Sequence, residues 1–233
     1  MSKRSASDEP GVTISIDFGT AGTGYAYCFD SAPGVIEARE PGGQQARKTL
    51  TCLLLDERGD FVNFGDAARQ QYYEDHEESP GLLLFTNYKM HLHSADSSAP
   101  VTKASNGVLW PLKDVIMQTL RYVKEEALKE VSKAQPHAVQ AHEVKWVVTV
   151  PAIWGDSSKG FMRETAHLAG LIRERASPLL VLALEPEAGC VACETDASHL
   201  KAGDGALILD CGGGTVDVTG AWRRRLVSPH TRP

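Results

Sequence analysis

Apolar residues recur along the chain at two different spacings, which predict a mixture of strands and helices. Short apolar, β-branched runs predict strands, and they lie at Val12–Phe18, Gly24–Phe29, Leu50–Leu55, Phe61–Phe64, Val144–Val150 and Leu179–Leu184. Helical spacing predicts a long amphipathic helix from Leu112 to Val131 and a shorter helix over Asp66–Tyr73. The polar stretches Glu74–Gly81 and His91–Gly107 predict loops.

The second half of the chain alternates strands with helices. Three residues offer N-caps for a helix that runs to Leu168, namely Asp156, Ser157 and Ser158. Pro186 follows the last of the strands above, where a helix would begin, and this is a favoured position for proline. Ala206–Leu209 and Val216–Thr219 predict two further strands. The alternation favours an α/β fold in which helices cover a sheet.

The composition is that of an ordinary globular protein and narrows the classes of function. Of 233 residues, 42% are hydrophobic and 23% are charged, and the formal net charge is −6. This acidic balance argues against nucleic acid as a partner, because phosphate backbones are bound by basic surfaces. No apolar run approaches the ~18 residues of a membrane span, and the polar start Met1–Gly11 is not typical of a secretory signal. An odd number of cysteines, 5, predicts reduced thiols and a cytoplasmic location.

Glycines cluster at the end of the first predicted strand, in Asp17-Phe18-Gly19-Thr20-Ala21-Gly22-Thr23-Gly24. Glycine lets the backbone approach a ligand closely, and consecutive amide groups in such a turn bind anions. The hydroxyls of Thr20 and Thr23 are placed to reach phosphate oxygens, whereas Asp17 suits a phosphate site only through a cation such as Mg²⁺. The cluster matches neither the P-loop pattern nor the dinucleotide-binding pattern. A plain tight turn is the alternative interpretation.

A second glycine cluster, Leu209-Asp210-Cys211-Gly212-Gly213-Gly214-Thr215-Val216-Asp217, repeats the chemical outline of the first. Each cluster passes from an apolar strand to aspartate, glycine and threonine, and then to a further strand. Two such hairpins far apart in one chain indicate a duplicated architecture that closes on a phosphate ligand from both sides. Two unrelated turns are the alternative.

An ordered set of motifs resembles the ATPase domain of the seventy-kilodalton heat-shock protein family between residues 12 and 219. The set comprises Asp17-Phe18-Gly19-Thr20, Gly65-Asp66-Ala67-Ala68, Val148-Thr149-Val150-Pro151-Ala152, Glu185-Pro186-Glu187-Ala188 and the second glycine cluster. Three segments resemble the divergent "twelve" branch of that family most, namely Phe64–Ala68, Tyr88–Met90 and Trp146–Trp154. The resemblance implies an α/β, actin-like ATPase fold of the ribonuclease H-like kind. It has a lobe with a mixed five-stranded type of sheet and flanking helices, and an incomplete second lobe.

The resemblance also implies which residues hold the phosphates of ATP or ADP. On one side these are the Gly19 and Gly22 backbone and the Thr20 side chain. On the opposite side they are Gly212, Gly213, Gly214 and Thr215. This chain departs from the family at Ala21, where a second threonine is usual, and at Gly22, where an aromatic residue is frequent. Phosphate contact would then depend more on backbone amides and on Thr23.

The remaining implied roles concern the metal and the reaction. Asp17 and Asp210 would bind the waters around Mg²⁺, and Asp217 would support that network. Glu185 would lie near the attacking water. Lys89 aligns with the family's essential lysine, which would stabilise charge on the transferring phosphoryl group. The alternative for Lys89 is a solvated surface lysine.

The resemblance divides the chain into a disordered lead (1–11), a first lobe (12–203), the start of a second lobe (204–219) and an unrelated basic tail (220–233). A second lobe that stops there would lack the adenosine pocket and would leave strand edges exposed to association. We therefore expect a truncated product with Mg-ATP affinity reduced by a factor on the order of 10²–10⁴ and little ATP hydrolysis.

The leading hypothesis is a nucleotide-dependent conformational switch of the heat-shock chaperone type, whose partners would be ATP, client proteins and co-chaperones. A non-catalytic interaction or regulatory fragment is the first alternative, and a small-molecule kinase of the same superfold is the second. Other motifs are weaker. Cys190-x-x-Cys193 fits packing on a helix better than a redox or metal pair, His91-x-His93 lacks companion ligands, and Arg223–Arg225 is short for a nuclear signal.

Overall fold

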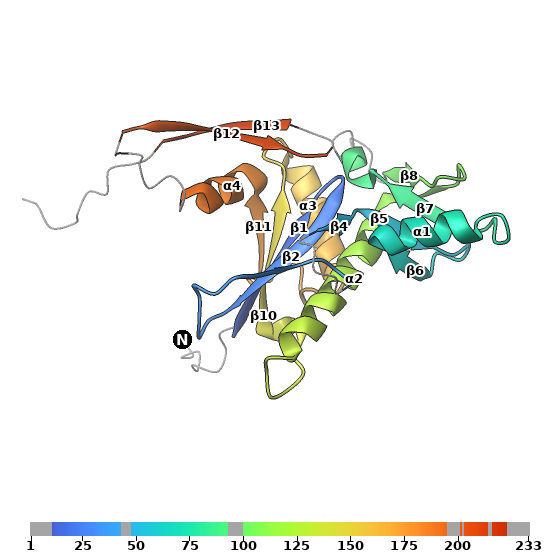
Figure 1. Ribbon diagram of the computed structural model, residues 1–233, viewed down its shortest axis with the longest axis horizontal. Helices are drawn as coiled ribbons and strands as arrows, with labels where there is room; N and C mark the ends of the chain where they lie inside the picture. Colours follow the sequence, from blue (N-terminus) through green and yellow to red (C-terminus); the bar gives the residue numbers. More distant parts are fainter. Residues whose placement is uncertain are drawn as a thin grey trace, which may run out of the picture.

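The computed structural model describes residues 11–42, 48–92, 100–194, 201, 203–213 and 216–222 (Figure 1). Its centre is a mixed sheet in the order β11-β10-β1-β2-β3, with β4 also paired to β2. The strands are β1 (Val12–Phe18), β2 (Gly22–Phe29), β3 (Glu37–Arg39), β4 (Thr49–Leu50), β10 (Val144–Val150) and β11 (Leu180–Leu184). The predicted mixed sheet is confirmed, but in the described part of the chain it has six strands and not five, because β3 and β4 both pair with β2 along different parts of its length.

Strand β1 lies in the middle of this sheet, and its side chains alternate between a fully buried apolar face and a partly covered, more polar one. Val12, Ile14, Ile16 and Phe18 are buried, and the residues between them are only partly covered. β1 runs parallel to β10 and antiparallel to β2. The alternation that predicted the strand therefore also sets which face meets the core.

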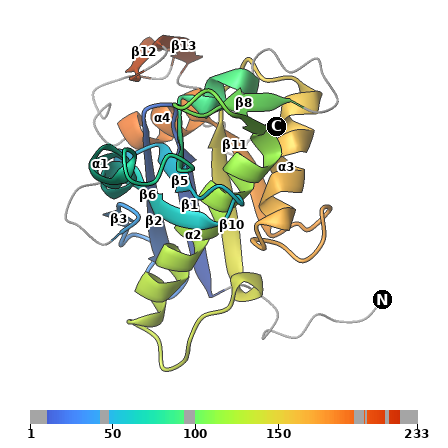
Figure 2. The ribbon, with the colours of Figure 1, turned by 90° about the vertical axis from the view of Figure 1, so that its right-hand side faces the viewer.

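Helices cover both faces of the sheet (Figures 1 and 2). α2 (Leu112–Ser132) and α3 (Asp156–Leu168) pack against each other on one face, and α4 (Glu185–Glu194) lies on the other. The apolar stripe predicted for α2 is buried from Leu112 to Val131. The predicted side-chain N-cap of α3 is wrong, because Gly155 is the capping residue and Asp156 is already in the first turn. There its charge still complements the positive end of the helix dipole.

A smaller sheet, in the order β6-β5-β7, extends beside the main one and packs on α1 (Gly65–Asp75). Its strands are β5 (Cys52–Leu55), β6 (Phe61–Phe64) and β7 (Leu83–Thr86). The strand predicted over Leu50–Leu55 is therefore two strands in two different sheets. The chain changes sheet at Thr51, whose buried backbone N–H donates to the Ala21 carbonyl at 2.9 Å.

The loop predicted from His91 to Gly107 is wrong in part. A 3₁₀ helix, η1 (Tyr88–Leu92), ends within it, and β8 (Val101–Lys103) pairs with β9 (Leu109–Pro111). Strands of three residues are too short to show a periodic pattern, so the sequence could not identify them. His93 lies outside the described residues. A second 3₁₀ helix, η2 (Ala141–Glu143), leads into β10.

The last described element is a hairpin of β12 (Gly205–Cys211) and β13 (Val216–Trp222), which lies along α4 (Figure 1). A Cβ placed at Gly189 of α4 would lie 3.8 Å from Ile208 of β12, in ordinary van der Waals contact, so the hairpin packs close to this part of the helix. Leu207, Leu209 and Val218 remain 59–68% exposed. Strand β13 continues through Trp222, past Gly220, where the sequence predicted the basic tail to begin. Within the described ranges, no helix combines the length and apolar character needed to cross a bilayer.

The cysteines differ in burial, and we therefore expect their thiols to differ in reactivity. Burial raises the pKa of the Cys52 thiol from 9.0 to about 12, whereas Cys193 and Cys211 are exposed. Because the thiolate is the reacting form, we expect native Cys52 to react with iodoacetamide at pH 8 on the order of 10³-fold more slowly than Cys211. Mass spectrometry of the alkylated peptides measures both rates. Equal rates in the native protein would contradict the burial of this strand.

Candidate functional site

The first glycine cluster is the tight turn between β1 and β2. The Gly19 N–H donates to the Gly22 carbonyl at 3.1 Å, and a Cβ at position 19 would overlap that same carbonyl oxygen. Only glycine fits there. Because its N–H closes the turn, the predicted phosphate contact from the Gly19 amide is not available in this geometry. Thr20 lies at the end of the turn, where its hydroxyl contacts the Met90 sulfur at 3.7 Å.

Two threonine hydroxyls brace this turn from inside the protein. The Thr51 hydroxyl donates to the Gly19 carbonyl at 2.7 Å and lies 2.8 Å from the Thr23 hydroxyl, which must then be the donor between the two threonines. Thr23 is fully buried. The expectation that Thr23 reaches a phosphate oxygen is therefore wrong, because its side chain points into the core and supports the turn from behind.

Asp17 lies at the carboxyl end of β1, where its carboxylate is held by two different residues. Its Oδ2 is 2.6 Å from the Lys48 ammonium, and its Oδ1 accepts the Thr149 hydroxyl of β10 at 3.2 Å. The pairing of β1 with β10 brings Thr149 to this position. The sequence indicated neither partner, because Lys48 and Thr149 lie 31 and 132 residues away along the chain.

Lys89 is buried, not solvated. From η1 its ammonium donates to the Phe18 carbonyl and to Glu185 Oε1, both at 2.6 Å. Its side chain is 4% exposed, and the ammonium lies 5.5 Å from the ring centroid of Phe18. The surface-lysine alternative is therefore wrong. Lys89 joins the end of β1 to the start of α4, and its charge is compensated by hydrogen bonds and by an opposite charge.

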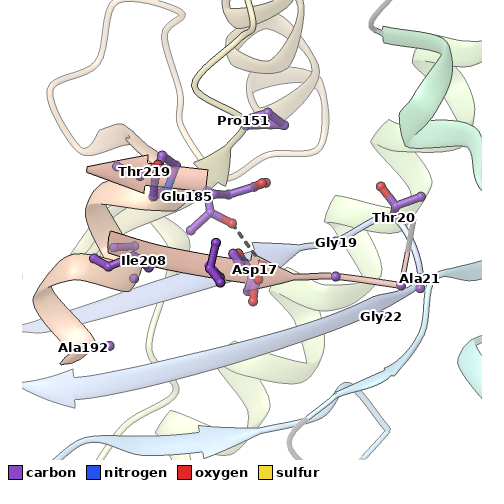
Figure 3. A pocket seen from close by; sticks show the side chains of 18 of the residues that line it. Asp17, Gly19, Thr20, Ala21, Gly22, Pro151, Glu185, Ala192, Ile208 and Thr219 are labelled. Atoms are coloured by element: carbon purple, nitrogen blue, oxygen red, sulfur yellow. Dashed lines mark hydrogen bonds between the residues drawn. The ribbon is translucent and has the colours of Figure 1, made fainter. Parts of the chain in front are cut away.

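The two glycine hairpins meet at one cavity of about 530 Å³ (Figure 3). The first hairpin contributes Gly19–Gly22 to the lining, and the second contributes Asp210, Gly212 and Gly213. A Cβ at Gly213 would overlap Ala21 Cβ, so glycine is needed where the hairpins touch. Gly214 and Thr215 lie outside the described residues, and the backbone of Asp217 pairs with Asp210.

Charged groups from five parts of the chain face this cavity. Asp17, Glu185 and Asp210 bring carboxylates, and Lys48 and Lys89 bring ammonium groups. Figure 3 shows Asp17 and Glu185 among the residues that line the cavity. Carboxylates with a hydroxyl and two lysines are suited to a phosphate group together with a hydrated divalent cation. The closely approaching glycine backbones, where a Cβ would not fit, agree with such a ligand.

Cys193 also lines the cavity, whereas Cys190 on the same helix does not. Among the described residues, no group of three or more metal-binding side chains comes together. Next to the site, burial raises the pKa of the Tyr88 phenol, whose hydroxyl is 2.7 Å from that of Thr119. Tyr88 therefore stays neutral and fixes η1, which carries Lys89, to α2.

Comparison with known proteins identifies relatives over most of the chain. Human heat shock 70 kDa protein 12B is 34% identical over 94% of this chain and 40% of its own length. Mouse heat shock 70 kDa protein 12A is 39% identical over 81% of this chain and 29% of its own length. The chain thus spans less than half the length of these relatives. No family model matches it.

Among solved structures, MreB 5 of Spiroplasma citri bound to AMPPNP has a similar fold. The TM-score is 0.55 with 14% sequence identity, over 94% of this chain and 51% of that one. This likeness shows the actin-like ATPase fold. The resemblance to the heat-shock family that the motifs indicated is confirmed by the curated relatives.

The buried hydroxyl pair behind the turn gives a testable stability effect. Thr51→Val removes the hydroxyl with little change of shape and leaves the Gly19 carbonyl and the Thr23 hydroxyl without their shared partner. We expect the free energy of unfolding to fall by about 1–3 kcal/mol, as measured by urea denaturation. Thr51→Ser keeps the hydroxyl and is the matched control. If the valine variant is as stable as the serine variant, the hydroxyl does not brace the turn.

Proposed function

We propose that this homologue of the heat shock 70 kDa proteins 12A and 12B binds the phosphates of ATP and ADP in the cavity between its two glycine hairpins. The observation that carries the proposal is the convergence on one cavity of the hairpins with Lys89 and Glu185. Lys89 and Glu185 are 96 positions apart in the chain. Two unrelated turns would not be expected to lie on either side of such a pair.

The lining favours the phosphates over the base as the main source of affinity. None of the described residues that line the cavity is aromatic, so stacking on an adenine ring has no partner among them. Two lysines, the hydroxyls of three threonines and the glycine backbones instead offer donors to anionic oxygens. The proposal is therefore a triphosphate or diphosphate site in which adenosine adds little.

A divalent cation, when bound, would neutralise phosphate charge, and the carboxylates of Asp17 and Asp210 would hold its water molecules. Both carboxylates line the cavity. Asp17 can serve in this way only when Lys48, which now lies 2.6 Å from its Oδ2, shares that carboxylate or leaves it.

Lys89 and Glu185 are the residues proposed to act on the terminal phosphate. Lys89 holds Glu185 in one orientation through the 2.6 Å contact to Oε1, which leaves Oε2 to accept a hydrogen bond from an attacking water. The same ammonium places a positive charge at the cavity wall, where charge on the transferring phosphoryl group develops. The positive charge of Lys89 compensates the negative charge of Glu185. Glu185 would therefore orient the attacking water more than it would remove a proton from that water.

In this proposal nucleotide binding stabilises the contact between the two hairpins, and loss of the nucleotide releases the second hairpin, which is the conformational switch. The hairpin is suited to move because it contacts the rest of the protein mainly through α4. A chaperone role with protein clients belongs to the same proposal and is supported by the similarity to heat shock 70 kDa proteins. The proposed cytoplasmic location rests on the odd number of cysteines.

Calorimetry tests the proposed phosphate site. We expect the full chain to bind Mg-ATP with a dissociation constant weaker than about 1 μM, inorganic triphosphate to compete with it, and adenosine to compete poorly. Gly213→Ala should weaken binding about tenfold or more, because the new methyl group overlaps Ala21 and separates the hairpins.

The double variant Ala21→Gly with Gly213→Ala is the matched control, since it removes the methyl group that the new one meets. Recovery of affinity in the double variant would tie binding to the contact between the hairpins. Undetectable binding of both ATP and triphosphate by the native chain would refute the proposed site. Tight binding driven by adenosine would also contradict it.

Single-turnover hydrolysis tests the role of Glu185. Glu185→Gln keeps the size of the side chain and the acceptor oxygen that faces Lys89, so ATP affinity should change less than about threefold. The slow hydrolysis of bound ATP should fall on the order of 10²-fold, because the amide orients water poorly. Glu187→Gln, on the same helix but outside the cavity lining, is the control. An unchanged rate in the Glu185 variant would assign hydrolysis to other groups.

A further inference from the structure

Lys48 reaches the cavity from a segment that carries no recognisable motif. It directly precedes β4, and the pairing of β4 with β2 places Leu50 opposite Gly22 and Thr49 opposite Thr23. The lysine stem then runs along the first glycine hairpin. A Cβ at Gly22 would lie 3.6 Å from both Cβ and Cδ of Lys48, which is van der Waals contact, so the lysine stem lies close beside the backbone of the turn.

The ammonium of Lys48 ends on Asp17, at 2.6 Å from Oδ2, and lines the same cavity as both hairpins. Lys48 differs from Lys89 in its solvent exposure and in the number of its partners. Lys89 is 4% exposed and has two fixed partners, whereas the Lys48 side chain is 52% exposed and is paired with Asp17. An ammonium has three donors, so Lys48 can keep Asp17 and still donate to a second anion.

Charge balance at the cavity indicates what that second anion is. The described lining carries three carboxylates and two lysines, and one lysine is already committed to Glu185. A phosphate placed beside Asp17 would be repelled unless a cation stood between them. The Lys48 ammonium is such a cation, because it is already ion-paired with Asp17 beside the first glycine hairpin.

We propose that Lys48 is a phosphate ligand of this site, which bridges Asp17 and a nucleotide phosphate and so lowers the dependence of binding on a divalent cation. This inference rests on the proposed nucleotide function. In the absence of a divalent cation the ammonium supplies the positive charge between carboxylate and phosphate. When a cation is bound, Asp17 faces the cation and Lys48 donates to the phosphate alone.

The test is ADP affinity by calorimetry on the full chain, once with excess Mg²⁺ and once with excess EDTA. We expect the native chain to retain measurable binding in EDTA. Lys48→Met should weaken binding about tenfold or more in EDTA and only about threefold in Mg²⁺. Lys48→Arg, which keeps the charge, should recover most of the loss. Lys145→Met removes an exposed lysine that does not line the cavity and should change neither value.

The outcomes separate this inference from the proposed function. If the native chain binds Mg-ADP and Lys48→Met binds it equally well in both conditions, the pair with Asp17 is only a surface ion pair, and the inference is overturned. Tighter Mg-ADP binding by the variant would overturn it too, because Lys48 would then exclude the cation. If the native chain binds no nucleotide in either condition, the proposed function fails and the inference fails with it.

A second measurement needs no variant. Acetylation of lysines with an amine-reactive ester in EDTA, followed by mass spectrometry, reports how accessible Lys48 is in the native chain. Inorganic triphosphate should slow the modification of Lys48 at least about threefold and leave that of Lys145 unchanged. Equal modification of Lys48 with and without triphosphate would contradict its role as a phosphate ligand.

Discussion

The structure depends on the pairing of β1 along both of its edges. β1 is antiparallel to β2 and parallel to β10, and its inward side chains are buried in the core. Because neither edge is free, its register is fixed on both sides. Asp17 is thereby placed at the carboxyl end of the strand beside Thr149, and the turn that follows is held at the same edge of the sheet.

Two buried side chains, those of Thr51 and Lys89, connect the end of β1 to the neighbouring elements by hydrogen bonds. Thr51, where the chain changes from one sheet to the other, holds the Gly19 carbonyl, and Lys89 holds the Phe18 carbonyl. Both bonds fall on the backbone next to the turn. A buried donor without a partner destabilises a protein by about 1–3 kcal/mol, so the turn, η1 and α4 are held in one arrangement. The cavity is rigid on this side, whereas the second hairpin rests chiefly on α4.

The site therefore combines a fixed half and a more loosely attached half. Ala21 and Gly213 meet where the hairpins touch, and the family's usual threonine at position 21 is replaced by a residue with only a methyl group. The small side chain lets the hairpins approach, and it removes one hydroxyl donor from the site. Lys48, half exposed and attached to Asp17, adds a donor on the same side of the cavity. A site that relies on backbone amides and lysines recognises phosphate charge more than the shape of a base.

The sequence by itself determined strands β1, β2, β10 and β11 of the main sheet, the long helix α2 and the first glycine turn, because each depends on residues that are neighbours in the chain. Periodicity and glycine geometry act over a few positions. Only the tertiary structure decided that Thr23 faces the core, that Lys89 is buried against Glu185, and that Lys48 reaches Asp17. The paired residues are 28 positions apart for Thr23 and Thr51, 96 for Lys89 and Glu185, and 31 for Lys48 and Asp17. The direction of these side chains follows from strand register and burial, which no local sequence pattern encodes.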